Sequence, residues 1–179
     1  TATGVLTAKD VNFGEEIVVD DPGAAVSPGE NDVVTIPSDL EEFYGTISGS
    51  GQVDVSGSLT FTGDMSEHTG TTNIGEKGTF TVTGSDVKLG TGTFAVTGTL
   101  KLEVQGTFVF EAKTTGSGAL EISSGATVSF SKSVGVKTLN VSDGATLRGG
   151  VSLMHKEAVL NLAGTLALNA DAGKKVTLG

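Results

Sequence analysis

The sequence contains no cysteine, no tryptophan and a single tyrosine in 179 residues. Without cysteine it has neither a disulfide framework nor a thiolate zinc site. The shortage of flat aromatic side chains disfavours sugar-binding platforms and base-stacking surfaces. No apolar run approaches the roughly 18 residues of a membrane span, so we expect no membrane insertion. The first residues lack the basic start and apolar stretch of a signal peptide, which predicts that any export signal has been removed.

Basic residues are also scarce, with 11 Lys and Arg against 21 Asp and Glu, a net charge of -10. Residues 1–42 contain ten carboxylates, one lysine and all three prolines, whereas the acids and bases of residues 43–179 almost cancel. Without a basic stripe, nucleic acid is not an expected partner. We predict an acidic, non-repetitive N-terminal segment over 1–45, acting as a cap or assembly arm, and a repeat domain over 46–179.

The residues that are abundant are small, namely 27 Gly, 25 Thr and 16 Ser. Apolar residues alternate with polar ones in short runs such as 79–83, 94–102 and 106–110, which predicts strands with one buried face. Glycine recurs every few residues between these runs and supplies the turns. The pattern predicts strand after strand and no helix.

An internal repeat organises these strands. LEISSGATV at 120–128 matches LNVSDGATL at 139–147, and LNLAGTLAL at 160–168, VDVSGSLTF at 53–61 and LEVQGTFVF at 102–110 have a form shorter by one residue. The anchor glycines of the motif are Gly57, Gly78, Gly106, Gly125, Gly144 and Gly164. Their steps are 19 to 21 residues except for one of 28, between Gly78 and Gly106, where Gly92 and Gly98 leave the phasing open.

A unit of about 20 residues cannot bury its own apolar face, but stacked copies share a continuous core. The sequence therefore predicts an all-β fold, a right-handed parallel β-solenoid of roughly seven rungs, about 33 Å long at the strand spacing of about 4.8 Å. An antiparallel β-sandwich is the alternative. The apolar positions expected to stack inward are Val53, Val55, Leu102, Val104, Leu120, Ile122, Leu139, Val141, Leu160 and Leu162.

Asn140 and Asn161 occupy matching positions of the motif, between two apolar residues. Stacked asparagines hydrogen-bond from rung to rung in some solenoids, which is one interpretation. The other is a solvent-facing position, because Asp54, Glu103 and Glu121 occupy the equivalent place elsewhere.

Residues 49–82, GSGQVDVSGSLTFTGDMSEHTGTTNIGEKGTFTV, resemble the autotransporter-associated β-strand repeat. Residues 59–63 match its strand ending in Thr-Gly, 69–73 its Gly-Thr-Thr step and 78–80 its closing strand, whereas 64–68 replace its usual Asn-Thr-Tyr. Residues 118–168 are similar to looser repeats of the same passenger domains. The resemblance implies a parallel β-helix exported to a bacterial surface, and, since the family's membrane barrel is missing here, a fragment, a cleaved passenger or a separate surface protein.

Candidate chemistry is sparse. The only arginine is Arg148 and the acids of the repeat domain are scattered singly, so we predict no enzyme. His68 and His155 lie in polar stretches, which favours exposed turn residues over metal ligands. Oxygen ligands for calcium are grouped at Asp10, Asn12 and Glu15, and at Glu30 and Asp32, but neither group matches a calcium-loop motif, and a solvated polyanionic segment is the preferred interpretation. No other cofactor is expected.

The predicted function is that of a non-catalytic, adhesin-like structural module at the bacterial cell surface, with surface glycans, surface proteins or a second copy as partners. Ile17 to Val19, Val33 to Ile36 and the C-terminal Val176 to Gly179 are β-branched or apolar segments suited to head-to-tail pairing. A carbohydrate-binding or polysaccharide-degrading β-helix is the alternative. Pairs of threonines at 60/62, 79/81 and 97/99 also suggest an outward array of the ice-binding type.

Overall fold

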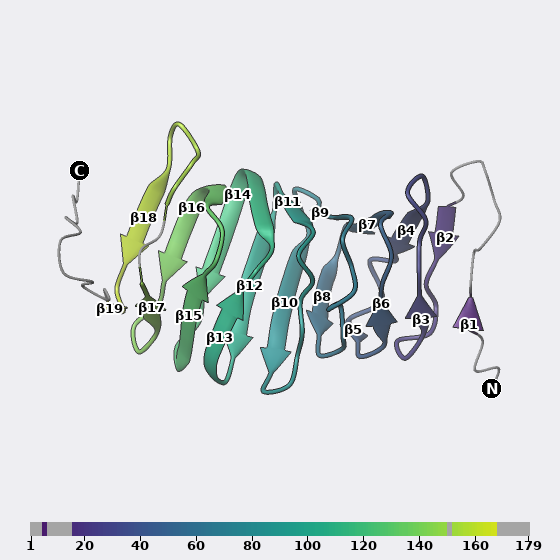
Figure 1. Cartoon of the computed structure of the whole chain (residues 1–179), viewed down its shortest axis with the longest axis horizontal. Coiled ribbons are helices and arrows are strands. Elements are labelled where there is room, and N and C mark those ends of the chain that lie inside the picture. The colour runs from purple at the N-terminus through teal and green to yellow at the C-terminus, as the bar shows by residue number, and fades with distance from the viewer. Residues whose placement is uncertain (1–4, 7–15, 150–151, 168–179) are drawn as a thin grey trace.

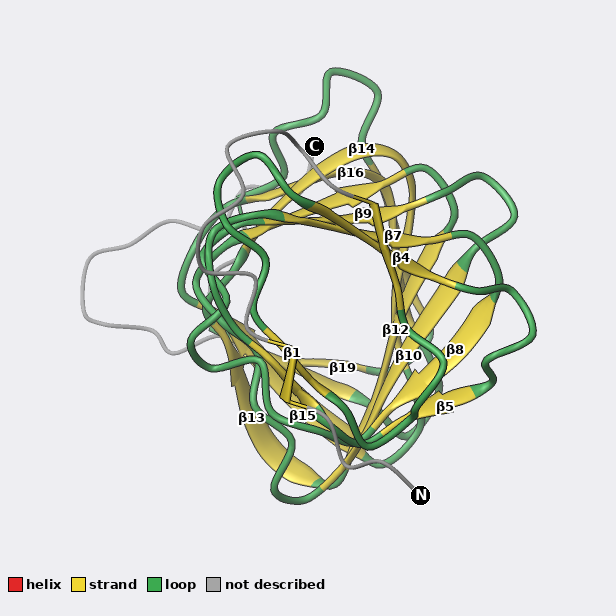
Figure 2. Cartoon of the chain, turned by 90° about the vertical axis from the view of Figure 1, so that its right-hand side faces the viewer, coloured by secondary structure: helices red, strands yellow, loops and turns green. Residues whose placement is uncertain are grey.

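The computed structural model describes residues 5–6, 16–149 and 152–167. These residues form a parallel β-solenoid of about seven turns, and the part of the chain described contains no helix (Figure 1). Viewed along the axis, each turn has three faces, which we call faces A, B and C in chain order (Figure 2). The chain follows these faces clockwise as it recedes from the N-terminal side, which is the right-handed sense.

Faces A and B belong to one sheet, and face C is formed by two smaller sheets. Face A comprises β2 (Glu16–Val18), β4 (Val33–Ile36), β7 (Gln52–Val55), β9 (Thr71–Ile74), β11 (Thr93–Val96) and the first parts of β14 (Lys113–Ile122) and β16 (Val134–Val141). Face B comprises β5 (Glu42–Phe43), β8 (Ser58–Phe61), β10 (Thr79–Gly84), β12 (Thr99–Val104), the second parts of β14 and β16, and β18 (Val159–Leu162). Face C comprises β1 (Val5–Leu6), β3 (Ala25–Val26), β6 (Thr46–Ile47), β13 (Gly106–Phe110), β15 (Ala126–Phe130), β17 (Thr146–Arg148) and β19 (Thr165–Ala167).

Every pairing between the described strands is parallel, which confirms the solenoid and excludes the antiparallel sandwich. Val53 of β7 lies between Val34 of β4 and Thr72 of β9, its equivalents one repeat before and one repeat after it. One repeat of the sequence thus brings each strand onto its equivalent in the next turn. The period read from the sequence is therefore the length of one turn.

Strand pairing continues across the expected boundary between residues 45 and 46. Ile17 of β2 pairs with Val34 of β4, and Val34 pairs with Val53 of β7. The two short strands expected near residues 17–19 and 33–36 are thus stacked on the first turns of their own chain. The acidic part that the structure describes forms the N-terminal turns of the same stack.

Alternating side chains of the three faces fill the inside of the coil. Six of the eight phenylalanines form a stack along the axis, with neighbouring ring centroids 5.4 to 6.1 Å apart. The stack passes from face B through face A to face C, in the order Phe43, Phe61, Phe80, Phe94, Phe110 and Phe130. Because aromatic pairs are stabilised beyond their buried area, this column ties together turns that are otherwise joined by backbone pairing.

The anchor glycines belong to two different corners, which accounts for the irregular step between Gly78 and Gly106. Gly57 and Gly78 precede face B, and the register places Gly98 next in that series. Gly106 and Gly164 begin face C, and Gly125 and Gly144 lie just before it. The same short motif therefore occurs at the corner from A to B early in the chain and at the corner from B to C later.

Glycine is needed at these corners for two different reasons. Gly106, Gly125 and Gly144 have φ values of 75°, 83° and 76°, a region that other residues rarely adopt. A Cβ atom on Gly98 would instead lie 2.2 Å from the carbonyl oxygen of Gly78, in the preceding turn. Gly106, Gly125 and Gly144 thus require a backbone conformation, whereas Gly98 requires space between turns, as does Gly164, where a Cβ atom would lie 2.4 Å from the Ser142 carbonyl oxygen.

The ten predicted core positions are buried except at the C-terminal end. Ile122, Val141 and Leu162 are in register as expected, and Ile122 and Val141 are at most 1 % exposed. The prediction that Leu162 is buried is wrong, since it is 42 % exposed, and Leu160 is only partly buried. Among the described strands none pairs with the outer edge of β18, so the cover that other turns give to these positions is incomplete here.

Replacement of Val141 by Asp tests the register of β16. An unpaired carboxylate in the core should lower the free energy of unfolding by about 3 kcal/mol. Ser142→Asp, at the exposed next position, is the matched control and should change it by less than about 0.5 kcal/mol. Urea denaturation measures both, and equal stabilities for the two variants would contradict the assigned register.

Replacement of Gly98 by Ala tests the close approach of neighbouring turns. Its methyl group would meet carbonyl oxygens of Gly75 and Gly78 within 2.3 Å, and we expect a loss of about 2 kcal/mol or more. Gly75→Ala is the control, because its nearest contact is an ordinary 3.6 Å and its φ is not positive. In thermal unfolding, the melting temperature of Gly98→Ala should lie well below that of Gly75→Ala. The reverse order would contradict the register that places Gly98 against Gly78.

Candidate functional site

The outward side chains of face B form rows that run along the rod. One row contains Thr81, Lys101, Glu121, Asn140 and Asn161 in successive turns. The Asn161 amide donates to Asn140 Oδ1 at 2.8 Å, and the Asn140 amide donates to Glu121 Oε1 at 3.2 Å. Asn140 and Asn161 therefore bond from turn to turn, on a face that is also open to solvent.

The carboxylates at the equivalent motif positions do not come together. Asp54 lies on face A, where it accepts hydrogen bonds from Gln52 at 2.7 Å and Asn73 at 3.2 Å. Glu103 and Glu121 lie on face B but in different rows, since Glu121 is opposite Lys101 and Glu103 is opposite Thr83. Lys101 forms an ion pair with Glu103. Each acid thus has a local structural partner.

The threonine pairs do not stack as the sequence pattern suggested. Thr79 is in register with Ser58 and Thr99, and Thr81 is in register with Thr60 and Lys101. Thr97 lies at the corner before face B, where its hydroxyl donates to the Ile74 carbonyl at 2.9 Å. A small group of threonines remains on β10 and its neighbours, but Lys101 interrupts it.

The second calcium candidate forms a tight turn. Asp32 is buried, and its carboxylate accepts a hydrogen bond from the Gly29 N–H at 2.8 Å, whereas Glu30 is exposed. Asp10, Asn12 and Glu15 lie outside the described residues. Among the residues that are described, no group of three or more acidic, histidine or cysteine side chains is arranged to hold a metal ion.

The melting temperature tests the calcium hypothesis directly. If the acidic segment is a solvated polyanion, millimolar calcium and millimolar magnesium should give the same melting temperature, since neither ion then binds the folded state selectively. Differential scanning calorimetry of the whole chain measures this. A rise with calcium alone would favour a specific site instead.

The two histidines have different environments. His155 is half-buried, and its Nδ1 accepts a hydrogen bond from the Glu157 N–H at 3.1 Å. His68 was expected in an exposed turn, and this prediction is wrong, because the side chain is 2 % exposed. Its turn folds inward at the corner between faces C and A, where His68 pairs with Gly49 of the preceding turn. Because the neighbours of His68 in the sequence are polar, the sequence pattern did not indicate that its side chain is buried.

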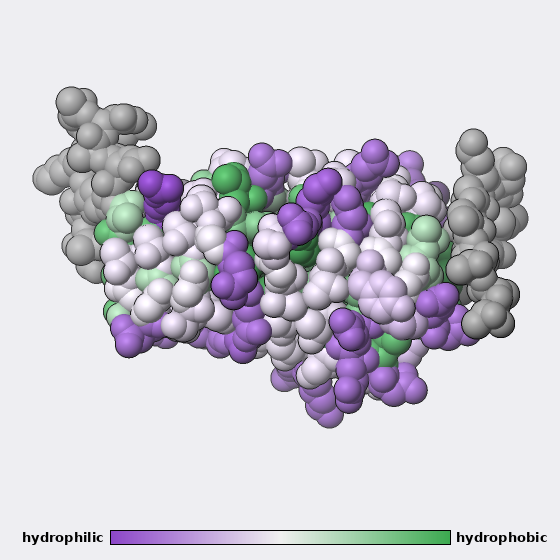
Figure 3. Space-filling view, turned by 90° about the horizontal axis from the view of Figure 1, so that it is seen from below, coloured by the Kyte–Doolittle hydropathy of each residue, from purple (hydrophilic) through white to green (hydrophobic). Residues whose placement is uncertain are grey.

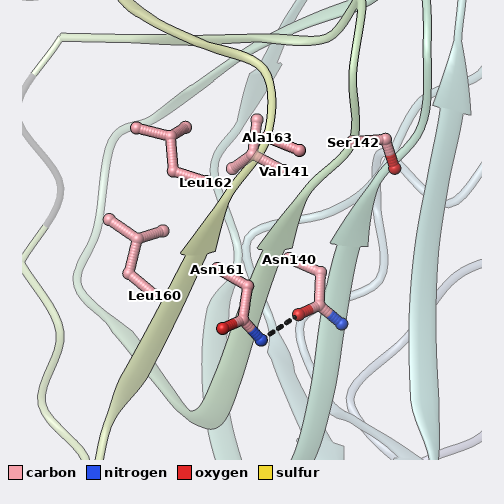
Figure 4. A pocket seen from close by; sticks show the side chains of 7 residues that line it. All are labelled: Asn140, Val141, Ser142, Leu160, Asn161, Leu162 and Ala163. Carbon is pink, nitrogen blue, oxygen red and sulfur yellow. Dashed lines mark hydrogen bonds between the residues drawn. The ribbon is translucent and has the colours of Figure 1, made fainter.

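A shallow groove lies at the C-terminal end of face B, beside β18, the last strand of that face (Figure 4). Its lining is a mixture of apolar and amide groups from β16, β18 and the residues that follow each: Asn140, Val141, Ser142, Leu160, Asn161, Leu162 and Ala163. Leu160 and Leu162 point to the side of β18 opposite Asn161. The equivalent residues of β16, Leu139 and Val141, are buried completely, so the groove exposes what is core elsewhere.

The lateral surface differs from this end. Residues of hydrophilic or intermediate hydropathy cover most of the surface seen in Figure 3, and apolar residues occur there in small patches. Within the described residues, no helix has the length and apolarity needed to cross a membrane. The two features that stand out are the polar rows along the rod and the groove at its end, which exposes leucines.

No family model, curated protein or solved structure significantly matches the chain.

Proposed function

We propose that this chain is a non-catalytic structural module of a bacterial surface protein, adhesin-like in the manner of autotransporter passengers, and that it associates end to end. The observation that carries the proposal is the exposed core at the C-terminal turn. Partners of the lateral face are surface glycans or proteins, and the partner of the end is a second copy. An extracellular location on the cell surface is part of the same proposal.

The solenoid suits a spacing and display role because its turns are linked continuously. Backbone pairing on faces A and B and the phenylalanine column both run along the axis. A rod held in this way keeps its lateral rows at fixed separations of about 4.8 Å. Such a surface presents repeated weak contacts to an extended partner and needs no deep pocket.

The last strand of face B, β18, offers a template for another strand. The edge of β18 is unpaired among the described strands, and Leu160 and Leu162 are available beside it. Backbone groups at such an edge pair readily with another chain, and the leucines add apolar area. A continuing coil would bury both.

Charge favours a head-to-tail arrangement of two copies. Residues 16–42 contain eight carboxylates and no lysine or arginine, whereas residues 132–167 contain four cations and two carboxylates. Two acidic ends repel each other, and an acidic end is attracted to a weakly basic one. Because the joined surfaces differ, the contact repeats and produces filaments.

Sedimentation of the whole chain tests this proposal. We expect mass to increase with protein concentration and Leu162→Asp to remain monomeric, since a carboxylate would then be placed in the contact. Val109→Asp is the matched control, because Val109 is a similarly exposed apolar residue on face C. It should associate like the parent.

Two outcomes would contradict the proposal. A parent that stays monomeric at high concentration removes the end-to-end contact. Equal loss of association in both variants shows a non-specific apolar effect, and places the contact elsewhere than β18.

A carbohydrate-binding face is the second candidate, supported by the hydrogen-bonding row of Glu121, Asn140 and Asn161 on face B. Amide and carboxylate groups in a regular row match the hydroxyl groups of an extended glycan. A glycan array separates the candidates: retention of one glycan class, lost on replacing Asn161 by Leu, favours sugar binding. The ice-binding alternative has weaker support because Lys101 interrupts the group of threonines. A measurement of thermal hysteresis tests this alternative.

A further inference from the structure

His68 is a buried imidazole whose ring nitrogens lack a well-formed hydrogen bond. Neither Nδ1 nor Nε2 has a hydrogen-bond partner of good geometry among the described residues, although both atoms are buried. The backbone around it is well bonded, with the His68 N–H donating to Met65 and the Thr69 N–H donating to Gly49, both at 2.9 Å. Burial therefore favours the neutral ring, because a charge there would lose its hydration and the nearby backbone of Ser48 and Gly49 would offset that loss only in part.

This corner lies where the wall of the solenoid is least continuous. Face C contains no described strand between β6 and β13, and only isolated bridges connect Thr46 to Asp64 and Asp64 to Lys88. Next to His68, Met65 N–H donates to the Lys88 carbonyl at 2.8 Å, and Gly90 fits closely against the His68 carbonyl. Turn hydrogen bonds and isolated bridges hold this corner in place of a continuous strand ladder, and local opening begins at such places.

The charged groups nearby do not compensate for a charge on His68. Burial lowers the pKa of His68, the nearby backbone of Ser48 and Gly49 opposes this in part, and no charged side chain of the described residues contributes. Glu67, next to it in the chain, is exposed. Asp64 is engaged with Ser66 and with Lys88 at 3.6 Å, and chiefly the hydrogen bonds from Ser66 lower the pKa of the Asp64 carboxyl. Asp64 thus stays ionised at mildly acidic pH, and its ion pair is unchanged there.

We propose that His68 makes this corner acid-sensitive, so that mild acid opens residues 64–70 and 88–92 while the remaining turns stay paired. In the opened corner the imidazole meets water and accepts a proton at its ordinary pKa of about 6.5. Because the buried form binds the proton less well, the closed corner is fully stable above pH 6.5 and loses stability as pH falls below it. The opening constant then rises up to about tenfold per pH unit.

Hydrogen exchange of the whole chain at pH 7.5, 6.5 and 5.5 tests this, after correction for the intrinsic pH dependence of exchange. Amides of 64–70 and 88–92 should lose protection about tenfold between pH 7.5 and 5.5, and amides of 139–147 should not. His68→Leu should abolish the pH dependence, because the group that titrates is gone. His155→Gln, at the other histidine, should retain it.

Protection of the corner that is independent of pH in the parent would overturn the proposal, as would a pH dependence that persists in His68→Leu. If that variant fails to fold, NMR titration of the His68 ring in the parent decides: a pKa at or above 6.5 refutes the inference. Hydrogen exchange of Leu162→Asp, which we expect to remain monomeric, separates this local opening from end-to-end association.

Discussion

Parallel pairing between successive turns is the constraint on which the rest of this molecule depends. A strand can pair with its equivalent in the next turn only if the intervening chain closes a loop of suitable length. The regular step from one turn to the next, such as that from Val34 to Val53, is the result. Once this closure is set, identical positions of neighbouring turns lie about 4.8 Å apart, and whatever occupies them forms a row. The phenylalanine column inside and the amide row outside are both consequences.

The same constraint explains why glycine has two distinct roles. At the corner before face B the backbones of two turns come so close that a single Cβ would meet a carbonyl oxygen, as at Gly98. At the corner before face C the chain reverses through a positive φ, as at Gly125, where a Cβ would meet nothing. A motif that looks uniform in sequence therefore performs two tasks, and it moves from one corner to the other along the chain.

Stacking also makes the ends and irregular corners the informative places. In a middle turn, every inward side chain is covered by the turn on either side, and every outward one has a neighbour in its row. At β18 this cover is missing among the described strands, so leucines of the core register become surface. At the corner of His68, a turn replaces a strand, and a titratable ring occupies a buried place. Both sites arise from departures from the repeat.

The sequence alone determined the fold class, the length of a turn and most of the inward positions, because alternation and a regular period are local properties that stacking requires. It did not determine the phase of the turns between Gly78 and Gly106, since two corners share one motif and only the register tells them apart. The sequence alone also did not determine that His68 is buried or that Leu162 is exposed. Both depend on what lies in the neighbouring turn, a full repeat away along the chain, and that neighbour is decided by the tertiary structure.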